Sequence, residues 1–263
     1  MKLRMFQIDA FAERQFEGNP AAICPLETWL DDTLLQAIAA ENNLSETAYF
    51  VPAGDAFELR WFTPVEEVDL CGHATLASAH VLYTHLAYTK PEVRFLTRSG
   101  PLTVTRGDQG LRMDFPAAQP VMTESPEALL EGLGKAPEEV LAAFDYIAVY
   151  DTEEEIQALT PDFAKLQTLG LRGVVVTAPG KDVDFVSRCF FPKFQVNEDP
   201  VTGSAHCELA PYWQMRLGRR ELQARQLSNR GGSIGCEIKG DRVLLSGKAV
   251  DFMVAEIQID LDQ

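Results

Sequence analysis

Two classes of protein are disfavoured by what the sequence lacks. No apolar run approaches the roughly 20 residues that a membrane-spanning helix needs. Positive charge is also scarce, because 23 lysines and arginines stand against 39 acidic residues and give a formal net charge of −16. A nucleic-acid-binding protein must neutralise phosphates with basic side chains. We therefore expect neither a membrane protein nor a nucleic-acid-binding protein.

Cysteine and histidine are too few and too scattered for a disulfide framework or a metal site. The five cysteines include no CxxC pair: Cys24, Cys71, Cys189, Cys207 and Cys236. The four histidines show no metal-ligand spacing, so we expect no metal. The N-terminal residues 1–9 also lack the apolar core of a signal peptide. We therefore expect a cytoplasmic protein whose cysteines are mostly small core residues.

What is present is an α/β pattern. A chain of 263 residues with 46% apolar content can bury one large core or two modest ones. An amphipathic helix is expected from Asp31 or Asp32 to about Asn42. Helices are also expected from His73 to about Leu86 and from about Ser204 to Leu217, and strand patterns fill most of the remainder. Residues 116–124 resemble a linker. We expect two lobes, 1–116 and 117–263, with a possible return of the chain between lobes near the C-terminus.

The two halves of the sequence repeat one another. Three pairs of segments match: 59–64 (LRWFTP) with 187–192 (SRCFFP) at an offset of 128, 71–74 (CGHA) with 202–205 (TGSA) at 131, and 48–53 with 173–178 at 125. Three extra loop residues in the second copy explain the change from 128 to 131. An ordered series of matches at nearly constant offset indicates an internal duplication.

The duplicated turns can bind anions. The first N–H groups of a helix have no intrahelical partner, and the helix dipole makes that end partly positive. Gly72 and Gly203 stand at the two helix starts and allow another group to approach the backbone closely. Two such turns related by pseudo-symmetry could hold one small anionic molecule. The alternative is that both turns are ordinary helix caps.

Four side chains, three at these turns and one outside them, are candidates for chemistry. His73 follows Gly72 and could titrate near neutral pH, and Ser204 takes the matching position in the second copy. Asp199, or its neighbour Glu198, lies at the second turn. Glu46 lies between an amphipathic helix and an apolar strand, where partial desolvation would suit it to proton transfer. From spacing alone, an ordinary surface-loop glutamate is the better interpretation of Glu46.

Five ordered motifs resemble those of the PhzF-like isomerases, relatives of the phenazine-biosynthesis isomerase. The motifs are DAF at 9–11, FEGNPAA at 16–22, LSETA at 44–48, LCGHAT at 70–75 and EDPVTGSAH at 198–206. Further similarity is found at 229–232 and 246–249. The resemblance implies a diaminopimelate-epimerase-like α+β fold. In that fold two pseudo-symmetric lobes each wrap strands around a central helix, and the active site lies between the lobes.

The resemblance also implies cofactor-free proton transfer. The residue that matches the family's general acid/base is Glu46. The residues that match its substrate site are Ser45, Gly72, His73, Asp199, Gly203 and Ser204. The implied partner is a small anionic substrate, and homodimers are common in the family.

One departure separates this sequence from the related two-cysteine epimerases and racemases. Cys71 occupies one thiol position, but Thr202 occupies the other, and threonine is a poor base without a strong activator. We therefore expect a cofactor-independent isomerase that moves a proton through Glu46. The alternatives are a racemase or epimerase of an amino-acid-like acid and a non-enzymatic protein that binds small carboxylates.

Overall fold

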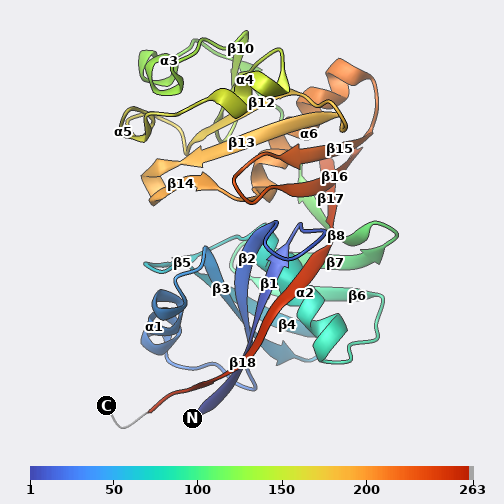
Figure 1. Ribbon diagram of the computed structural model, residues 1–263. Coiled ribbons are helices and arrows are strands. Elements are labelled where there is room, and N and C mark those ends of the chain that lie inside the picture. The colour runs from blue at the N-terminus through green and yellow to red at the C-terminus, as the bar shows by residue number, and fades with distance from the viewer. Residues whose placement is uncertain (261–263) are drawn as a thin grey trace. The chain divides into compact units, whose positions relative to one another are not determined.

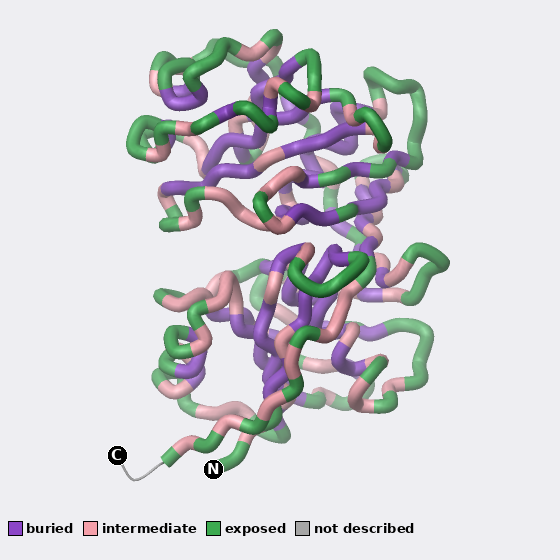
Figure 2. Tube along the Cα trace, viewed as in Figure 1, coloured by how far each residue is buried: buried purple, intermediate pink, exposed green. Residues whose placement is uncertain are grey.

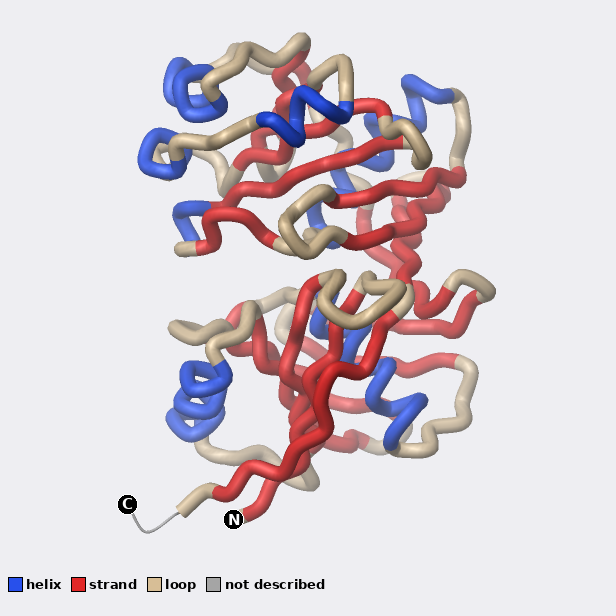
Figure 3. Tube along the Cα trace, viewed as in Figure 1, coloured by secondary structure: helices blue, strands red, loops and turns tan. Residues whose placement is uncertain are grey.

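A computed structural model of the protein describes residues 1–260. Contacts divide the chain into two units. Unit 1 comprises Met1–Asp114 and the described residues from Ser246 onward, and unit 2 comprises Phe115–Leu245. Figure 3 shows that strands dominate both units. No helix within residues 1–260 is both long enough and apolar enough to cross a membrane.

Unit 1 is a sheet with one central and one outer helix (Figure 1). Its strands are β1 (Lys2–Ala10), β2 (Asn19–Pro25), β3 (Glu46–Ala53), β4 (Ala56–Phe62), β5 (Glu67–Val68), β6 (Glu92–Thr97), β7 (Gly100–Gly107), β8 (Gly110–Pro116) and β18 (Ala249–Gln258). They pair in the order β18-β1-β2-β3-β4-β6-β7-β8, and β5 adds to the end of β4. The helices are α1 (Asp32–Asn42) and α2 (Gly72–His85).

Unit 2 repeats this arrangement. Its strands are β9 (Val121–Met122), β10 (Glu139–Ala142), β11 (Tyr146–Val149), β12 (Val174–Pro179), β13 (Phe185–Phe191), β14 (Val196–Asp199), β15 (Glu221–Gln226), β16 (Gly232–Lys239) and β17 (Arg242–Gly247). Its helices are α3 (Glu127–Leu133), α4 (Glu153–Ala158), α5 (Phe163–Leu166), η1 (Pro192–Phe194) and α6 (Gly203–Leu217). The parallel pairs β2/β3 and β4/β6 of unit 1 recur as β11/β12 and β13/β15.

The helices α2 and α6 are the central helices of their units. Nine of the 14 residues of α2 and ten of the 15 residues of α6 are buried, as Figure 2 shows by colour. Small residues in α2 let the strands approach the helix closely. The two buried hydroxyl groups of α2 bond to carbonyl groups of the same helix: Thr75 Oγ1 donates to Cys71 O (2.6 Å), and Ser78 Oγ donates to Ala74 O (2.7 Å). These bonds satisfy polar groups that would otherwise be costly to bury.

In each unit a separate apolar cluster lies between the sheet and the outer helices. In unit 1, α1 packs Leu35, Ile38 and Ala39 against a cluster that includes Met5 and Tyr49. In unit 2, α3, α4 and α5 contribute to a cluster around Tyr150, Val176 and Phe190. Thr152 and Glu155 form a capping box at the start of α4. The N-cap of α3 is Pro126, which makes no side-chain cap bond.

Strand register corrects the upstream part of the duplication. Ala48 lies opposite Trp61, and Val175 lies opposite Cys189. Trp61 and Cys189 are 128 residues apart, so their partners Ala48 and Val175, at an offset of 127, are equivalent. The sequence alignment at 125 is therefore wrong by two residues, because apolar runs in buried strands match almost equally well at several offsets.

The corrected offset of 127 has a consequence at the start of these strands. Glu46 of unit 1 is equivalent to Gly173 of unit 2, and Ser45 is equivalent to Arg172. The later offset of 131 is supported by the next strand pair, since Trp61 lies opposite Val68 and Cys189 lies opposite Asp199.

Candidate active site

In unit 1 three polar side chains meet at the start of α2. Glu46 begins β3, Cys71 is the N-cap of α2, and His73 lies in its first turn. Glu46 Oε2 is 3.0 Å from His73 Nε2, close enough for an ion pair, although the two groups are not aligned for a hydrogen bond. Cys71 Sγ lies 3.5 Å from His73 Nδ1. The side chains of His73 and Glu46 are 8% and 18% exposed, so this is a secluded acid–imidazole pair.

The protonation of this cluster follows from burial and charge. Burial by itself lowers the pKa of His73, but Cys71 and the Glu46 carboxylate outweigh it and raise the pKa of His73 well above its ordinary value. Burial and the Glu46 charge raise the pKa of the Cys71 thiol. These shifts favour the protonated imidazole of His73 and the protonated thiol of Cys71.

One donor atom from each of these three residues lies within 4.8 Å of the others, so they could also hold a metal ion. A thiol must lose its proton to ligate a metal. In the absence of a metal, the raised pKa of Cys71 keeps its thiol protonated. The same arrangement presents a carboxylate that could exchange a proton with a bound molecule.

The N-termini of α2 and α6 differ from those of most other helices. The helices α1, α4 and α5 are capped by the side chains of Asp31, Thr152 and Asp162. The N-caps of α2 and α6, Cys71 and Thr202, make no side-chain cap bond, and neither helix has an acid in its first turn. Neither Cys71 nor Thr202 therefore acts as a side-chain cap. Their positive ends are suited to an anionic ligand.

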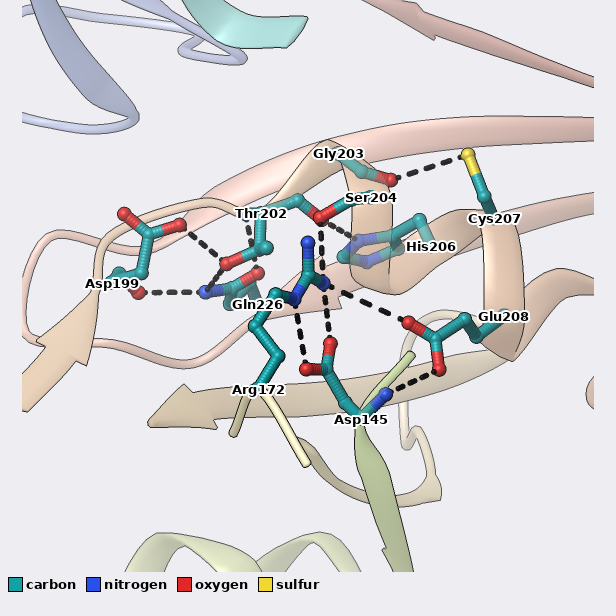
Figure 4. Close-up of polar contacts among 10 residues, drawn as sticks. All are labelled: Asp145, Arg172, Asp199, Thr202, Gly203, Ser204, His206, Cys207, Glu208 and Gln226. Carbon is teal, nitrogen blue, oxygen red and sulfur yellow. Dashed lines mark hydrogen bonds and ion pairs between the residues drawn. The ribbon is translucent and has the colours of Figure 1, made fainter. Parts of the chain in front are cut away.

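In unit 2 the Thr202 hydroxyl does not cap α6 but bonds to a side chain of the preceding loop. It donates to Asp199 Oδ2 (2.5 Å), while Thr202 N donates to Gln226 Oε1 (2.8 Å). Gln226 Nε2 donates to the Asp199 carbonyl (2.7 Å), which fixes the loop before α6 (Figure 4). Gly203 follows directly, and a Cβ there would meet only Leu245 Cδ1 at 3.6 Å. The turn is thus held rigidly from one side by Gln226 and Asp199.

The structure separates the two acids of this loop. Glu198 forms a two-pronged ion pair with Arg188 (2.7 and 3.0 Å). The equivalent pair in unit 1 is Glu67 with Arg60 (2.7 Å for both bonds). Glu198 therefore belongs to a duplicated structural pair, whereas Asp199 is the acid at the start of α6.

Ser204 is held by a network that sequence reasoning missed. Arg172 Nη2 donates to Ser204 Oγ (3.0 Å) and to Asp145 Oδ2 (2.5 Å), and Arg172 Nε donates to Asp145 Oδ1 (2.9 Å). Glu208 Oε2 accepts from the Asp145 amide (3.2 Å), and Glu208 Oε1 lies 3.8 Å from Arg172 Nη2. Figure 4 shows the guanidinium between Asp145 and Ser204. The only feature of the sequence that pointed to this network was an arginine, Arg172, directly before the predicted strand that begins at Gly173.

Burial sets the charges in this network. Asp145 and Glu208 are fully buried. Burial, followed by the charge of Asp145, raises the pKa of Glu208 to about 8. At neutral pH Glu208 is therefore mostly protonated, while Arg172 remains a cation. Nearby His206 is also fully buried, which lowers its pKa to about 4, and its ring contacts Thr202 O at 2.8 Å as a neutral structural group.

The expected site residues thus fall into two groups, one in each unit. In unit 1, Glu46 and His73 are in contact, Gly72 begins α2, and Ser45 is half-buried immediately before β3. In unit 2, Asp199, Gly203 and Ser204 lie at the start of α6.

Comparison with known proteins gives one consistent result. The family model of phenazine biosynthesis-like proteins (PhzC-PhzF) matches residues 8–255. An uncharacterized isomerase of Pseudomonas aeruginosa is 55% identical over 259 residues, which cover 98% of this chain and all of that protein. A PhzF-family crystal structure from Enterococcus faecalis is 46% identical, with a TM-score of 0.96 over 98% of this chain and all of that one.

A more distant likeness concerns the fold alone. A probable proline racemase from Agrobacterium radiobacter is 13% identical, with a TM-score of 0.63 over 99% of this chain and 93% of that one. Together with the PhzF-family structure, it confirms the predicted diaminopimelate-epimerase-like fold, in which each unit wraps strands around a central helix.

Proposed function

The chain belongs to the phenazine biosynthesis-like family of isomerases and epimerases, and we propose that it moves a proton within a small carboxylate-bearing molecule without a cofactor. Glu46 is the acid and base of this reaction. The observation that carries the proposal is the contact of Glu46 with His73 at the uncapped start of α2. It combines a proton acceptor, a cation and a helix N-terminus that favours negative charge.

The proposed reaction has two steps. Glu46 as carboxylate takes a proton from a carbon next to a carbonyl group or double bond, which leaves the substrate as an enolate or extended carbanion. The imidazolium of His73 and the first N–H groups of α2 stabilise the developing negative charge. Glu46 then returns the proton to a different carbon, so atoms and charge balance and the mass of the substrate is unchanged.

The start of α6 in unit 2 is proposed to bind an anionic group of the substrate. The start of α6 offers backbone N–H groups, the hydroxyl of Ser204 and the carboxylate of Asp199. Arg172 places Ser204 by donating a hydrogen bond to it. We therefore expect Ser204→Ala to raise the KM for the substrate more than it lowers kcat, because Ser204 binds the substrate and does not transfer the proton.

Solvent exchange provides the test of Glu46. Small carboxylic acids with an acidified C–H group are incubated in D₂O with the wild type, with Glu46→Gln and with Glu41→Gln, which removes an exposed acid of α1. General acid–base catalysis contributes ~10²–10⁴-fold, and we expect Glu46→Gln to lose at least that lower factor of deuterium incorporation. Full exchange by Glu46→Gln would rule out its role. Exchange that survives EDTA treatment would support the absence of a metal from the reaction.

A second candidate is an epimerase that uses Cys71. The favouring observation is the 3.5 Å contact between Cys71 Sγ and His73 Nδ1, an arrangement that can activate a thiol. Against it, the equivalent position in unit 2 is Thr202, whose hydroxyl is bonded to Asp199. Substitution of Cys71 distinguishes the two mechanisms.

A further inference from the structure

A second cluster of metal-ligating side chains lies in unit 1, outside the Glu46–His73 pair. His85 Nε2 is 2.8 Å and His80 Nε2 is 3.2 Å from the same atom, Asp251 Oδ1. One donor atom from each residue lies within 4.8 Å of the other two. His80 is seven residues beyond His73 on α2, which is about 10 Å along the helix axis. The cluster is therefore separate from the proposed proton-transfer residues.

The end of α2 is shaped to bring its two histidines together. Residues five apart on a regular α-helix do not share a face, because successive residues turn by about 100°. Here the last turn widens: Leu86 N donates to Val81 O (3.2 Å), an i to i−5 bond. Such i to i−5 bonds are common at the C-terminal ends of helices. The ring of Phe6 packs on His85 at 4.6 Å between centroids and restricts its orientation.

A bulge in β18 supplies the carboxylate. Gln7 pairs with Met253 and Ile8 pairs with Asp251, so Phe252 is the extra residue. In a regular strand, Asp251 and Met253 would point to the same face. Instead Met253 packs in the apolar cluster under α1, while Asp251 contacts the histidines of α2. Bulges of this kind redirect side chains. Gln15 Nε2 also donates to the Asp251 carbonyl (2.9 Å).

We propose that His80, His85 and Asp251 form a binding site for a divalent transition-metal ion such as Zn²⁺. Two imidazoles and one carboxylate are ligands that Zn²⁺, Co²⁺ and Ni²⁺ accept. Zinc bonds of ~2.0–2.2 Å place tetrahedral donor atoms roughly 3.3–3.6 Å apart. The separation of His80 Nε2 from Asp251 Oδ1 (3.2 Å) is close to this range, and that of His85 Nε2 (2.8 Å) is shorter by about half an ångström, so a small outward movement of His85 would admit the ion.

The exposure of the cluster agrees with this assignment. The side chains of His80, His85 and Asp251 are 17%, 20% and 39% exposed, so a water molecule can complete the coordination. The ion would fasten β18 to the central helix of unit 1, which is a structural role that does not depend on the proposed reaction.

The test measures Co²⁺ and Zn²⁺ binding to the full chain after removal of metal with a chelator. We expect one equivalent of Co²⁺ with visible ligand-field absorption, displaced by Zn²⁺, and a rise of several degrees in Tm with Zn²⁺. Binding should weaken at least tenfold in His85→Ala and Asp251→Asn. The control Glu256→Gln removes another carboxylate of β18, which is exposed and paired with Lys2, and should bind like the wild type.

The same measurement on Cys71→Ala separates this site from the Glu46–Cys71–His73 cluster. Binding that persists in Cys71→Ala and is lost in His85→Ala supports the proposal. Two results would overturn it: binding lost only in Cys71→Ala, with sulfur-to-cobalt charge-transfer bands in the wild type, or wild-type binding no tighter than that of Asp251→Asn. In the second case the cluster is a hydrogen-bonded tie between α2 and β18 and nothing more.

Discussion

At the start of β3 and α2, unit 1 carries Glu46 and His73. At the equivalent positions unit 2 carries Gly173 and Ser204, and the neighbouring Arg172 takes over the contact with the helix start. Each unit thus joins the beginning of a strand to the first turn of its central helix at 3.0 Å, once as Glu46 to His73 and once as Arg172 to Ser204. Duplication preserved the backbone and let the chemistry diverge, with an acid suited to proton transfer in one copy and a cation that positions a hydroxyl in the other.

The largest effect on stability is expected from removing the cation of unit 2. Arg172→Met leaves the fully buried Asp145 without its partner, and breaking a buried ion pair from one side costs ~3–5 kcal/mol. Urea unfolding measures the loss. The control Lys165→Met removes the partner of Glu131 from an exposed pair and should cost less than ~1 kcal/mol. A loss in Arg172→Met no larger than in the control would show that unit 2 does not depend on this cation.

A smaller effect is expected in the pH dependence of unit 2. The pKa of Glu208 rises from 4.5 to about 8 on folding, so between these values the folded state keeps a proton that the unfolded state has released. Stability therefore falls as pH rises through this window. Glu208→Gln cannot release a proton, and its stability relative to the wild type should increase from pH 5 to pH 8 by up to a few kcal/mol. Urea unfolding at both pH values would contradict this if the difference stayed constant.

Adding any side chain at Gly173, the position of unit 2 equivalent to Glu46, is also expected to lower the stability of the protein. A Cβ on Gly173 would lie 2.3 Å from Phe191 Cδ1 and 2.5 Å from Phe190 O. Overpacking of this kind costs ~1–3 kcal/mol, which thermal unfolding of Gly173→Ala measures. Gly203→Ala is the matched control, because its Cβ meets only Leu245 Cδ1 at 3.6 Å. Equal stability of the two variants would mean that unit 2 could have kept an acid here.

The smallest effect is expected from the thiol of unit 1. If Glu46 moves the proton, Cys71→Ala should change the deuterium-exchange rate by less than about tenfold, or ~1.4 kcal/mol. The raised pKa of Cys71 agrees with this, since a protonated thiol is a poor base. If Cys71→Ala lost as much deuterium-exchange activity as Glu46→Gln, the epimerase mechanism would be favoured. The thiol would then be the chemical group that distinguishes unit 1 from unit 2.

Local signals in the sequence were sufficient for most elements. The expected helix from His73 to Leu86 is α2, Gly72–His85, and the expected start of α1 at Asp31 or Asp32 is confirmed by the side-chain cap of Asp31. Short strands such as β10 and β14 were missed because four residues carry little periodicity, and their pairing partners decide their structure. The family motifs predicted the residues at both turns, since these are contiguous in sequence.

The networks around those turns could not be predicted in the same way. Asp145, Arg172, Ser204 and Glu208 come from four separate segments, and their contacts depend on strand register. The alignment at an offset of 125 concealed the equivalence of Arg172 with Ser45. Chain spacing likewise said nothing of Asp251, which lies 166 residues beyond His85 and reaches it through a bulge.

The place of β18 in the sheet affects how the chain folds during its synthesis. Unit 2 is a continuous segment that is complete once Leu245 has left the ribosome, whereas β1 of unit 1 receives its neighbour β18 only after Gln258 has been added. At ~5–20 residues per second, β1 waits more than ten seconds with one edge unpaired. An exposed strand edge is prone to association with other chains. Nascent unit 1 is therefore the part of this protein that most needs protection by chaperones, although its residues are the first to be made.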